Sequence, residues 1–121
     1  MEKPYKKYLV WQRAHELAIL IYKLTSDFPK SEQYGLVSQL RRAAFSIPCN
    51  FVEGYMRGTT KEFLRFLDIS KASLTEVEYT IEFAKDVNLL TEESYNKLED
   101  LRSEAGFLLN KFIKSINKKK T

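Results

Sequence analysis

Apolar residues recur every three or four positions over residues 9–26, which is the period of an α-helix. The main stripe consists of Val10, Ala14, Leu17, Ile21, Leu24 and Phe28. A second stripe beside it consists of Trp11, Ala18, Tyr22 and Thr25. A helix with so much apolar circumference buries more than one side, so we expect it to lie deep in the molecule or to pack on another subunit.

The same period continues over residues 36–56, where Leu36, Leu40 and Ile47 belong to the apolar stripe. Pro48 falls inside this segment. Proline in a helix interior removes one backbone hydrogen bond and clashes with the preceding turn. We therefore predict either a kink near Pro48 or two helices that meet there.

Residues 60–87 and 92–117 are the third and fourth predicted helices, and polar residues mark their ends. Thr59 followed by Glu62 spells a capping box, and Thr91 is a good N-cap for the fourth helix. Asn88 can end the third helix because asparagine tolerates the left-handed backbone conformation.

These four segments and their short connections predict an all-α fold, an up-down-up-down antiparallel four-helix bundle whose second helix is kinked near Pro48. No change in composition marks a boundary, so we expect residues 1–121 to form one domain. We expect the chain to be frayed over residues 1–8 and in the basic tail at 118–121.

Charge is distributed unevenly along the 121 residues, whose formal net charge is +4. Residues 1–61 carry ten Lys/Arg and five Asp/Glu, whereas residues 62–117 carry seven and eleven, and three lysines follow. Three interpretations stay open at this point: solvated surfaces, a track for nucleic acid, or head-to-tail contacts between copies.

The single cysteine and single histidine limit the chemistry that the chain can perform. One cysteine, Cys49, excludes an intrachain disulfide and fits a reducing, cytoplasmic setting. The longest apolar run has six residues, too short to cross a membrane. Di-iron sites in bundles need two Glu-x-x-His pairs, but Gln12 stands three residues before His15. We expect no metal, no cofactor and no enzymatic activity.

Basic residues gather in the second predicted helix and at the start of the third. We predict that they bind nucleic acid through phosphates, with little sequence preference: Arg41, Arg42, Arg57, Lys61 and Arg65. Arg57 and Lys61 flank a helix N-terminus, whose free amides also favour anions. Alternatively, Arg41 or Arg42 pairs with acidic residues of the last two helices, within a subunit or between subunits.

The surplus of apolar residues on the first helix, together with the predicted kink, suggests where subunits meet. The predicted oligomer interface consists of Trp11, Ala18, Tyr22, Pro48 and Phe51.

Several short motifs are specific in combination. The chain spells Val10-Trp11-Gln12 and Phe28-Pro29 near its start, then QLRRAAFSIPCN over residues 39–50, then Glu53-Gly54 and Arg57-Gly58. Together they resemble the bacterial four helix bundle protein family, also named for the protein encoded in 23S rRNA intervening sequences. The resemblance implies a ring-like homopentamer. The family is similar to the accessory variability determinant of diversity-generating retroelements, a basic pentamer that binds nucleic acid and the reverse transcriptase of the retroelement.

Two hypotheses of function follow. The leading one is a non-enzymatic, oligomeric four-helix bundle that acts as an RNA-associated accessory protein, with a reverse transcriptase as a further partner if the gene belongs to a retroelement. The alternative is a protein-interaction scaffold whose arginines make contacts between subunits or with a partner protein. Neither hypothesis involves a membrane.

Overall fold

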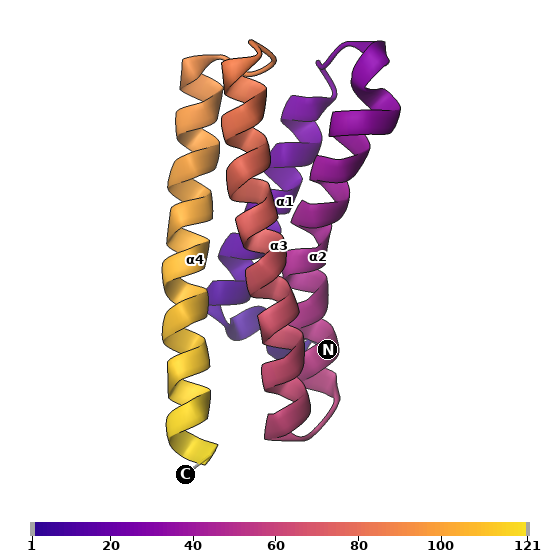
Figure 1. Cartoon of the computed structure of the whole chain (residues 1–121). Helices are drawn as coiled ribbons and strands as arrows, with labels where there is room; N and C mark the ends of the chain where they lie inside the picture. Colours follow the sequence, from indigo (N-terminus) through magenta and orange to yellow (C-terminus); the bar gives the residue numbers. More distant parts are fainter. Residues whose placement is uncertain (1, 121) are drawn as a thin grey trace.

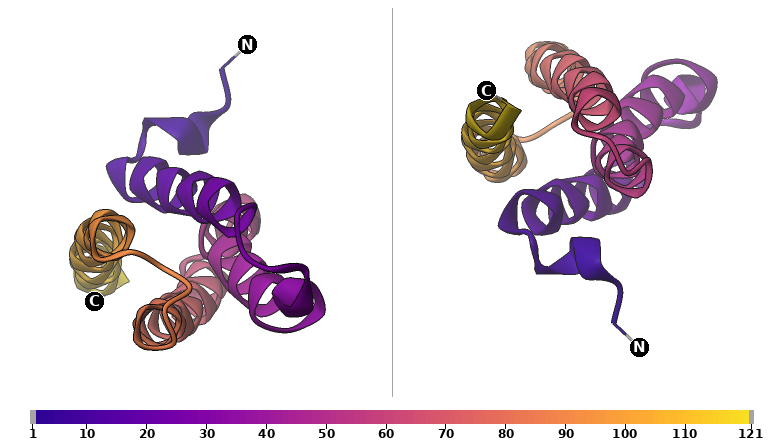
Figure 2. Two further views of the ribbon diagram at one scale, coloured as in Figure 1. Left: turned by 90° about the horizontal axis from the view of Figure 1, so that it is seen from above. Right: turned by 90° about the horizontal axis from the view of Figure 1, so that it is seen from below.

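The structure, a computed structural model, describes residues 2–120. Its four α-helices are α1 (Leu9–Thr25), α2 (Ser38–Met56), α3 (Thr60–Asp86) and α4 (Glu92–Lys120), and no strand occurs among the described residues. The helices alternate in direction, and α4 lies beside α1, so that the four surround a common core (Figures 1 and 2). The predicted all-α four-helix bundle is confirmed.

The core is built from the apolar stripes that the periodicity indicated. Leu17 and Ile21 of α1, Leu40 of α2, Leu67 of α3 and Leu98 of α4 are almost completely buried. Burying a side chain of this size contributes about 1.5–3 kcal/mol, so these five residues supply a large part of the stability.

Local polar residues set several of the helix ends. The Thr59 hydroxyl accepts a hydrogen bond from the Glu62 amide at 3.2 Å, and the Thr91 hydroxyl accepts one from the Ser94 amide at 3.1 Å. Asn88 follows α3 with a φ of 65°, the left-handed conformation expected of a helix stop. The Glu62 carboxylate accepts from Arg65, so only the N-cap half of the predicted capping box is confirmed. The predictions for Thr91 and Asn88 are confirmed.

The start of α2 and its path through Pro48 differ from two details predicted from the sequence. A π-helical turn, Gln33–Val37, leads directly into α2, where the sequence predicted a plain helix from Leu36. The helix then continues through Pro48 to Met56 as one element. The alternative of two helices meeting at Pro48 is therefore wrong, and the kink stays a prediction.

The predicted tail is helical for most of its length. α4 continues to Lys120, three residues beyond the predicted end at Asn117, because residues 107–120 contain no Gly or Pro and lysine is a good helix former. Near the other end of the chain, Pro4–Lys7 forms a short 3₁₀ turn, and Tyr5 packs edge-on against Trp11. Thr121 and Met1 lie outside the described residues.

An aromatic cluster fills the bundle at the end where α2 turns into α3. Phe51 is its centre, with ring centroids 5.3–5.8 Å from those of Tyr8, Phe63 and Phe112. Phe51 is only 2% exposed. The ring of Phe51 is enclosed by its own chain and cannot contact another subunit. The prediction that Phe51 belongs to the oligomer interface is therefore wrong.

Candidate nucleic-acid interface

Three of the five predicted phosphate-binding residues meet at the turn between α2 and α3. Arg57 follows the last residue of α2, and Lys61 and Arg65 lie on the first two turns of α3. All three are exposed. Gly58 makes the reversal with a φ of 86°, a conformation that glycine adopts without strain. The turn therefore presents three cations beside the N-terminus of α3, where the helix dipole adds positive potential.

The two arginines of this turn share an aromatic ring. The guanidinium carbons of Arg57 and Arg65 lie 4.9 and 4.6 Å from the centroid of the Phe66 ring. Such cation–π contacts hold the side chains near the surface while leaving N–H groups able to donate.

Carboxylates neutralise part of this charge. Arg65 Nε donates to Glu62 at 2.9 Å, and Arg57 lies 3.7 Å from Glu53. The hydrogen bond from Arg65 lowers the pKa of Glu62, and the charges of Arg65, Arg57 and Lys61 lower it further, whereas the same bond raises the pKa of Arg65. Lys61 has no ion pair within residues 2–120, so it is the cation of this turn that is best placed to meet a phosphate.

Arg41 lies elsewhere and is occupied by its own chain. Its guanidinium donates to the Thr25 hydroxyl at 2.9 Å, to the Tyr22 carbonyl at 3.1 Å and to the Ser26 hydroxyl at 3.3 Å. It also lies 3.9 Å from the centroid of the Tyr22 ring. The contacts satisfy the end of α1, where carbonyl groups lack helical partners and the dipole is negative.

These contacts change the interpretation of the arginine pair. Arg41 does not pair with an acidic residue of α3 or α4, as the alternative interpretation predicted. Its partners are groups at the end of α1, which is closer. Arg42, one position further around α2, is exposed and has no ion pair in the described part of the chain.

The end of α4 supplies further cations: Lys111 and Lys114 were not among the predicted phosphate-binding residues, and Lys118 was expected only as part of the basic tail. Lys111, Lys114 and Lys118 are spaced three and four residues apart, so they share one face of α4. Lys111 also lies 5.8 Å from the centroid of the exposed Phe107 ring. The signal that could have identified them was their helical spacing together with the absence of acidic residues over residues 108–119.

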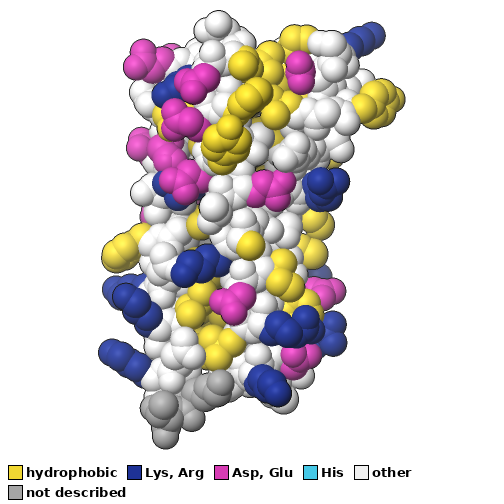
Figure 3. Space-filling view, viewed as in Figure 1, with side chains coloured by type: hydrophobic (Ala, Val, Ile, Leu, Met, Phe, Trp, Pro, Cys, Tyr) yellow, Lys and Arg dark blue, Asp and Glu magenta, His cyan; other side chains and the backbone are white. Residues whose placement is uncertain are grey.

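The basic charge consequently gathers at one end of the bundle. Residues 2–16, 50–70 and 108–119, which make up this end, carry eleven Lys/Arg and five Asp/Glu. Residues 17–49 and 71–107, toward the other end, carry eight and eleven. Figure 3 shows Lys and Arg spread over the lower part of the molecule and Asp and Glu concentrated over the upper part of α3 and α4.

Comparison with known proteins places this bundle in a family. The family model of the 23S rRNA-intervening sequence protein matches residues 6–111. The chain belongs to this family. A comparison with curated proteins gave no match.

Solved structures share the fold of this chain. One similar structure is that of a protein of unknown function from the S23 ribosomal protein family of Bacteroides thetaiotaomicron. It shares 25% identity with this chain at a TM-score of 0.78, over 88% of this chain and 99% of the other. The near-complete coverage shows that the bundle described above, from α1 to α4, is the architecture that the two proteins share.

In this intervening-sequence protein, the predicted interface residues line an apolar groove of about 510 Å³ between α1 and α2. Trp11, Ala18, Tyr22 and Pro48 all contribute to it. Cys49 and Glu53 also lie there, and burial and the Glu53 charge raise the pKa of the Cys49 thiol, which makes the thiol a poorer nucleophile. The structure thus brings four of the five predicted interface residues to one surface.

No metal-binding cluster accompanies these sites: residues 2–120 contain no group of three or more His, Cys, Asp or Glu side chains placed to hold an ion. None of the helices within the same residues is both long enough and apolar enough to span a bilayer.

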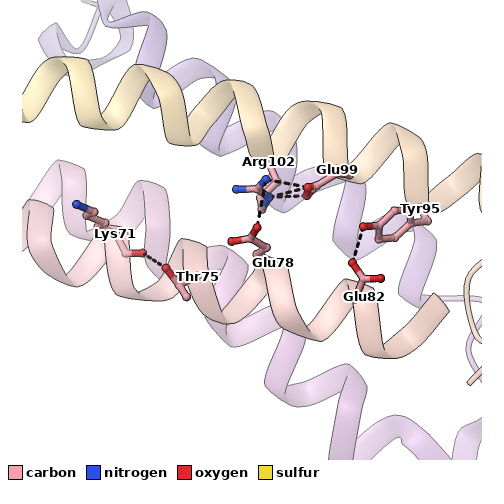
Figure 4. Close-up of polar contacts among 7 residues, drawn as sticks. All are labelled: Lys71, Thr75, Glu78, Glu82, Tyr95, Glu99 and Arg102. Atoms are coloured by element: carbon pink, nitrogen blue, oxygen red, sulfur yellow. Dashed lines mark hydrogen bonds and ion pairs between the residues drawn. The ribbon is translucent and has the colours of Figure 1, made fainter. Parts of the chain in front are cut away.

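Polar contacts between α3 and α4 form a network that the sequence did not reveal (Figure 4). Arg102 of α4, 15% exposed, donates three hydrogen bonds of 2.6, 2.8 and 3.1 Å to Glu99 and lies 3.6 Å from Glu78 of α3. The Tyr95 hydroxyl donates to Glu82 at 2.8 Å. These contacts fix α4 against α3 at the acidic end, opposite the cluster of cations.

Proposed function

We propose that the protein is a non-enzymatic RNA-associated accessory protein that contacts RNA phosphates through its basic end. The observation that carries this proposal is the gathering of cations from three helices at one end, with the net positive charge confined to that end. Phosphate contacts of this kind give affinity that depends on salt and little on sequence.

The contact surface consists of two parts of that end. One part is the α2–α3 turn, with Arg57, Lys61 and Arg65 around Phe66. The other part is the lysine face of α4, with Lys111 and Lys114. Arg41 is not part of the surface, because its guanidinium is bonded to the end of α1.

The test is the salt dependence of RNA binding. We expect a structured RNA to bind the wild-type protein more weakly as salt increases, with a log–log slope that falls by about 0.7–0.9 for each phosphate contact removed. The double variant Lys61→Gln/Lys114→Gln is therefore expected to have a slope smaller in magnitude by between one and two.

The matched control removes the same charge from the other end. Lys30 and Lys97 are exposed and lie away from the basic end. The variant Lys30→Gln/Lys97→Gln has the same net charge as the test variant and is expected to bind with nearly the wild-type slope. Equal slopes for the two variants, or no binding of the wild type at low salt, would reject the proposal.

We also propose that the protein is a homo-oligomer, a pentamer as the resemblance implies, in which the α1–α2 groove takes part in the subunit contact. Three groove residues support this: Ile19 is 43% exposed, Tyr22 57% and Phe45 64%. Large apolar side chains exposed together are typical of interaction surfaces. Light scattering coupled to size exclusion is expected to give about five times the 14.2 kDa of one chain.

A scaffold that binds another protein is the second candidate, and the apolar character of the groove favours it. It predicts that the Lys61→Gln/Lys114→Gln variant keeps its solution mass and its RNA affinity, while Phe45→Glu in the groove changes the mass.

A further inference from the structure

A second apolar surface lies on the outer side of α3. Tyr79, Phe83 and Val87 recur at intervals of four residues and are 69%, 44% and 46% exposed. The rings of Tyr79 and Phe83 lie 6.4 Å apart between centroids. We call these three residues the α3 ridge, and a streak of hydrophobic side chains over the upper part of α3 is visible in Figure 3.

The ridge is exposed for a structural reason. The buried side of α3 is formed by Val77, Ile81 and Ala84, which are fully enclosed. Tyr79 and Phe83 follow a different line on the helix, rotated away from that buried side, and Val87 is the C-cap residue directly after the helix. Among the described residues, these three side chains are not part of the core or of the apolar layer packed against it.

We infer that the α3 ridge of one copy packs into the α1–α2 groove of a second copy. This inference rests on the proposed homo-oligomer and specifies which two surfaces meet in it. The groove is concave, of about 510 Å³, and lined almost wholly by apolar groups, whereas the ridge is a row of projecting apolar side chains. A buried apolar centre of this kind is the usual core of a subunit contact.

Glu53 of the groove is paired with Arg57, and Lys85, beside Phe83, is paired with Glu82. Other charges near the two surfaces are complementary. Glu76 lies just before the ridge, and Asp86 lies within it, between Phe83 and Val87; both are exposed. The exposed Lys23 follows Tyr22, which lines the groove, and the exposed Arg42 is three residues before Phe45, which also lines it. Neither Lys23 nor Arg42 has an ion pair among residues 2–120, so both can meet carboxylates of another copy.

The arrangement of the helices then determines the kind of assembly. The groove lies between α1 and α2, and α3 lies on the other side of α2, so one copy presents both surfaces in different directions (Figure 2). A ridge cannot fill its own groove. Contacts between two unlike surfaces are head-to-tail, and repetition of such a contact closes a ring or extends a filament.

The test uses one variant on each surface. Phe45→Glu places a charge in the groove, and Phe83→Glu places one on the ridge; both positions are exposed, so the helices are expected to fold, which circular dichroism checks. We expect each variant to be a monomer. Phe107→Glu on α4, where the phenylalanine is 65% exposed, is the matched control and is expected to keep the wild-type mass.

Mixing the two variants separates unlike from like surfaces. Phe45→Glu keeps an intact ridge, and Phe83→Glu keeps an intact groove. One molecule of each can therefore form a single ridge-to-groove contact, and neither has a further intact surface for a third copy. A 1:1 mixture is expected to form a dimer and nothing larger. Retention of the oligomer by Phe83→Glu would overturn the ridge-to-groove contact while leaving the oligomer intact. A monomeric wild type would overturn both the proposed oligomer and this contact.

Discussion

Adjacent arginines on α2 have different surroundings at the scale of single residues. Arg41 points to the end of α1, where three hydrogen bonds and the Tyr22 ring hold it, whereas Arg42 is exposed. Successive residues on a helix point about 100° apart, so the sequence could predict that the two differ. It could not predict which one meets α1, because that depends on how the two helices pack.

Replacing Arg41 should therefore lower the free energy of unfolding. Arg41→Ala removes three hydrogen bonds from a charged donor and is expected to cost about 1–2 kcal/mol, measured by urea denaturation. Arg42→Ala, the adjacent control, is expected to stay within about 0.5 kcal/mol of the wild type. Equal losses at the two positions would contradict the assignment of Arg41 as the anchor of α1.

Tyr95 provides a prediction about pH. Its hydroxyl donates to the Glu82 carboxylate, and this hydrogen bond raises the pKa of Tyr95 to about 12. The hydrogen bond stabilises the neutral phenol in the folded state, so its contribution to stability is complete below the ordinary tyrosine pKa near 10 and is lost as the pH rises toward 12.

The measurement is the ultraviolet titration of phenolate in the wild type and in Tyr95→Phe. The signal lost in the variant is expected to be centred at about pH 12, with circular dichroism recorded at each pH to establish that the helices persist. A difference centred near pH 10 in the folded protein would show that the Glu82 contact does not form in solution.

At the scale of elements, the ends of the helices were predictable wherever a single residue sets them. Thr59, Thr91 and Asn88 act through their own side chains or backbone angles, so the local sequence contains the information. The π-helical turn at Gln33–Val37 has no comparable local signal. Neither the network around Arg102 nor the α3 ridge was predicted, because each depends on which side of a helix faces its neighbours.

Gly54 permits the close approach of α2 and α3. A Cβ atom at this position would lie 2.7 Å from Phe66 Cβ and 3.2 Å from the Phe63 carbonyl oxygen, so one of the helices would have to move. Alanine in a helix is favoured over glycine by about 1 kcal/mol, but overpacking costs about 1–3 kcal/mol. We expect Gly54→Ala to lower the unfolding free energy.

Gly106 is the matched control for this substitution, since it also lies inside a helix. A Cβ there would lie 3.1 Å from a terminal methyl group of Leu74, which can rotate away. Gly106→Ala is therefore expected to be less destabilising than Gly54→Ala by about 1 kcal/mol or more in thermal or urea unfolding. The opposite order would indicate that α2 and α3 are not in close contact at Gly54.

At the scale of the whole molecule, the antiparallel arrangement changes the meaning of the charge pattern. The sequence indicated a basic first half and an acidic second half. Folding instead joins the start of α1, the α2–α3 turn and the end of α4 at one basic end. The candidate site was therefore predicted in part: the turn around Lys61 was recognised, but the lysines of α4 join it only through the topology.

A head-to-tail ring would also affect RNA binding. In a closed ring with cyclic symmetry, every basic end points to the same side, so several copies can contact one RNA at once. The monomeric variant Phe45→Glu is expected to bind RNA with lower affinity and a smaller salt slope than the wild type, although its basic end is unchanged. Equal affinities and slopes would show that each copy binds RNA alone.

The separation of charge along the bundle also makes each copy an electric dipole. α4 alone is about 44 Å long, given a rise of 1.5 Å for each of its 29 residues. The Debye length is about 30 Å at 0.01 M salt and about 8 Å at 0.15 M. The opposite ends of neighbouring molecules therefore attract one another over distances comparable with the length of the bundle only in dilute buffer. Static light scattering should therefore show a second virial coefficient that is negative at low ionic strength and rises with added salt.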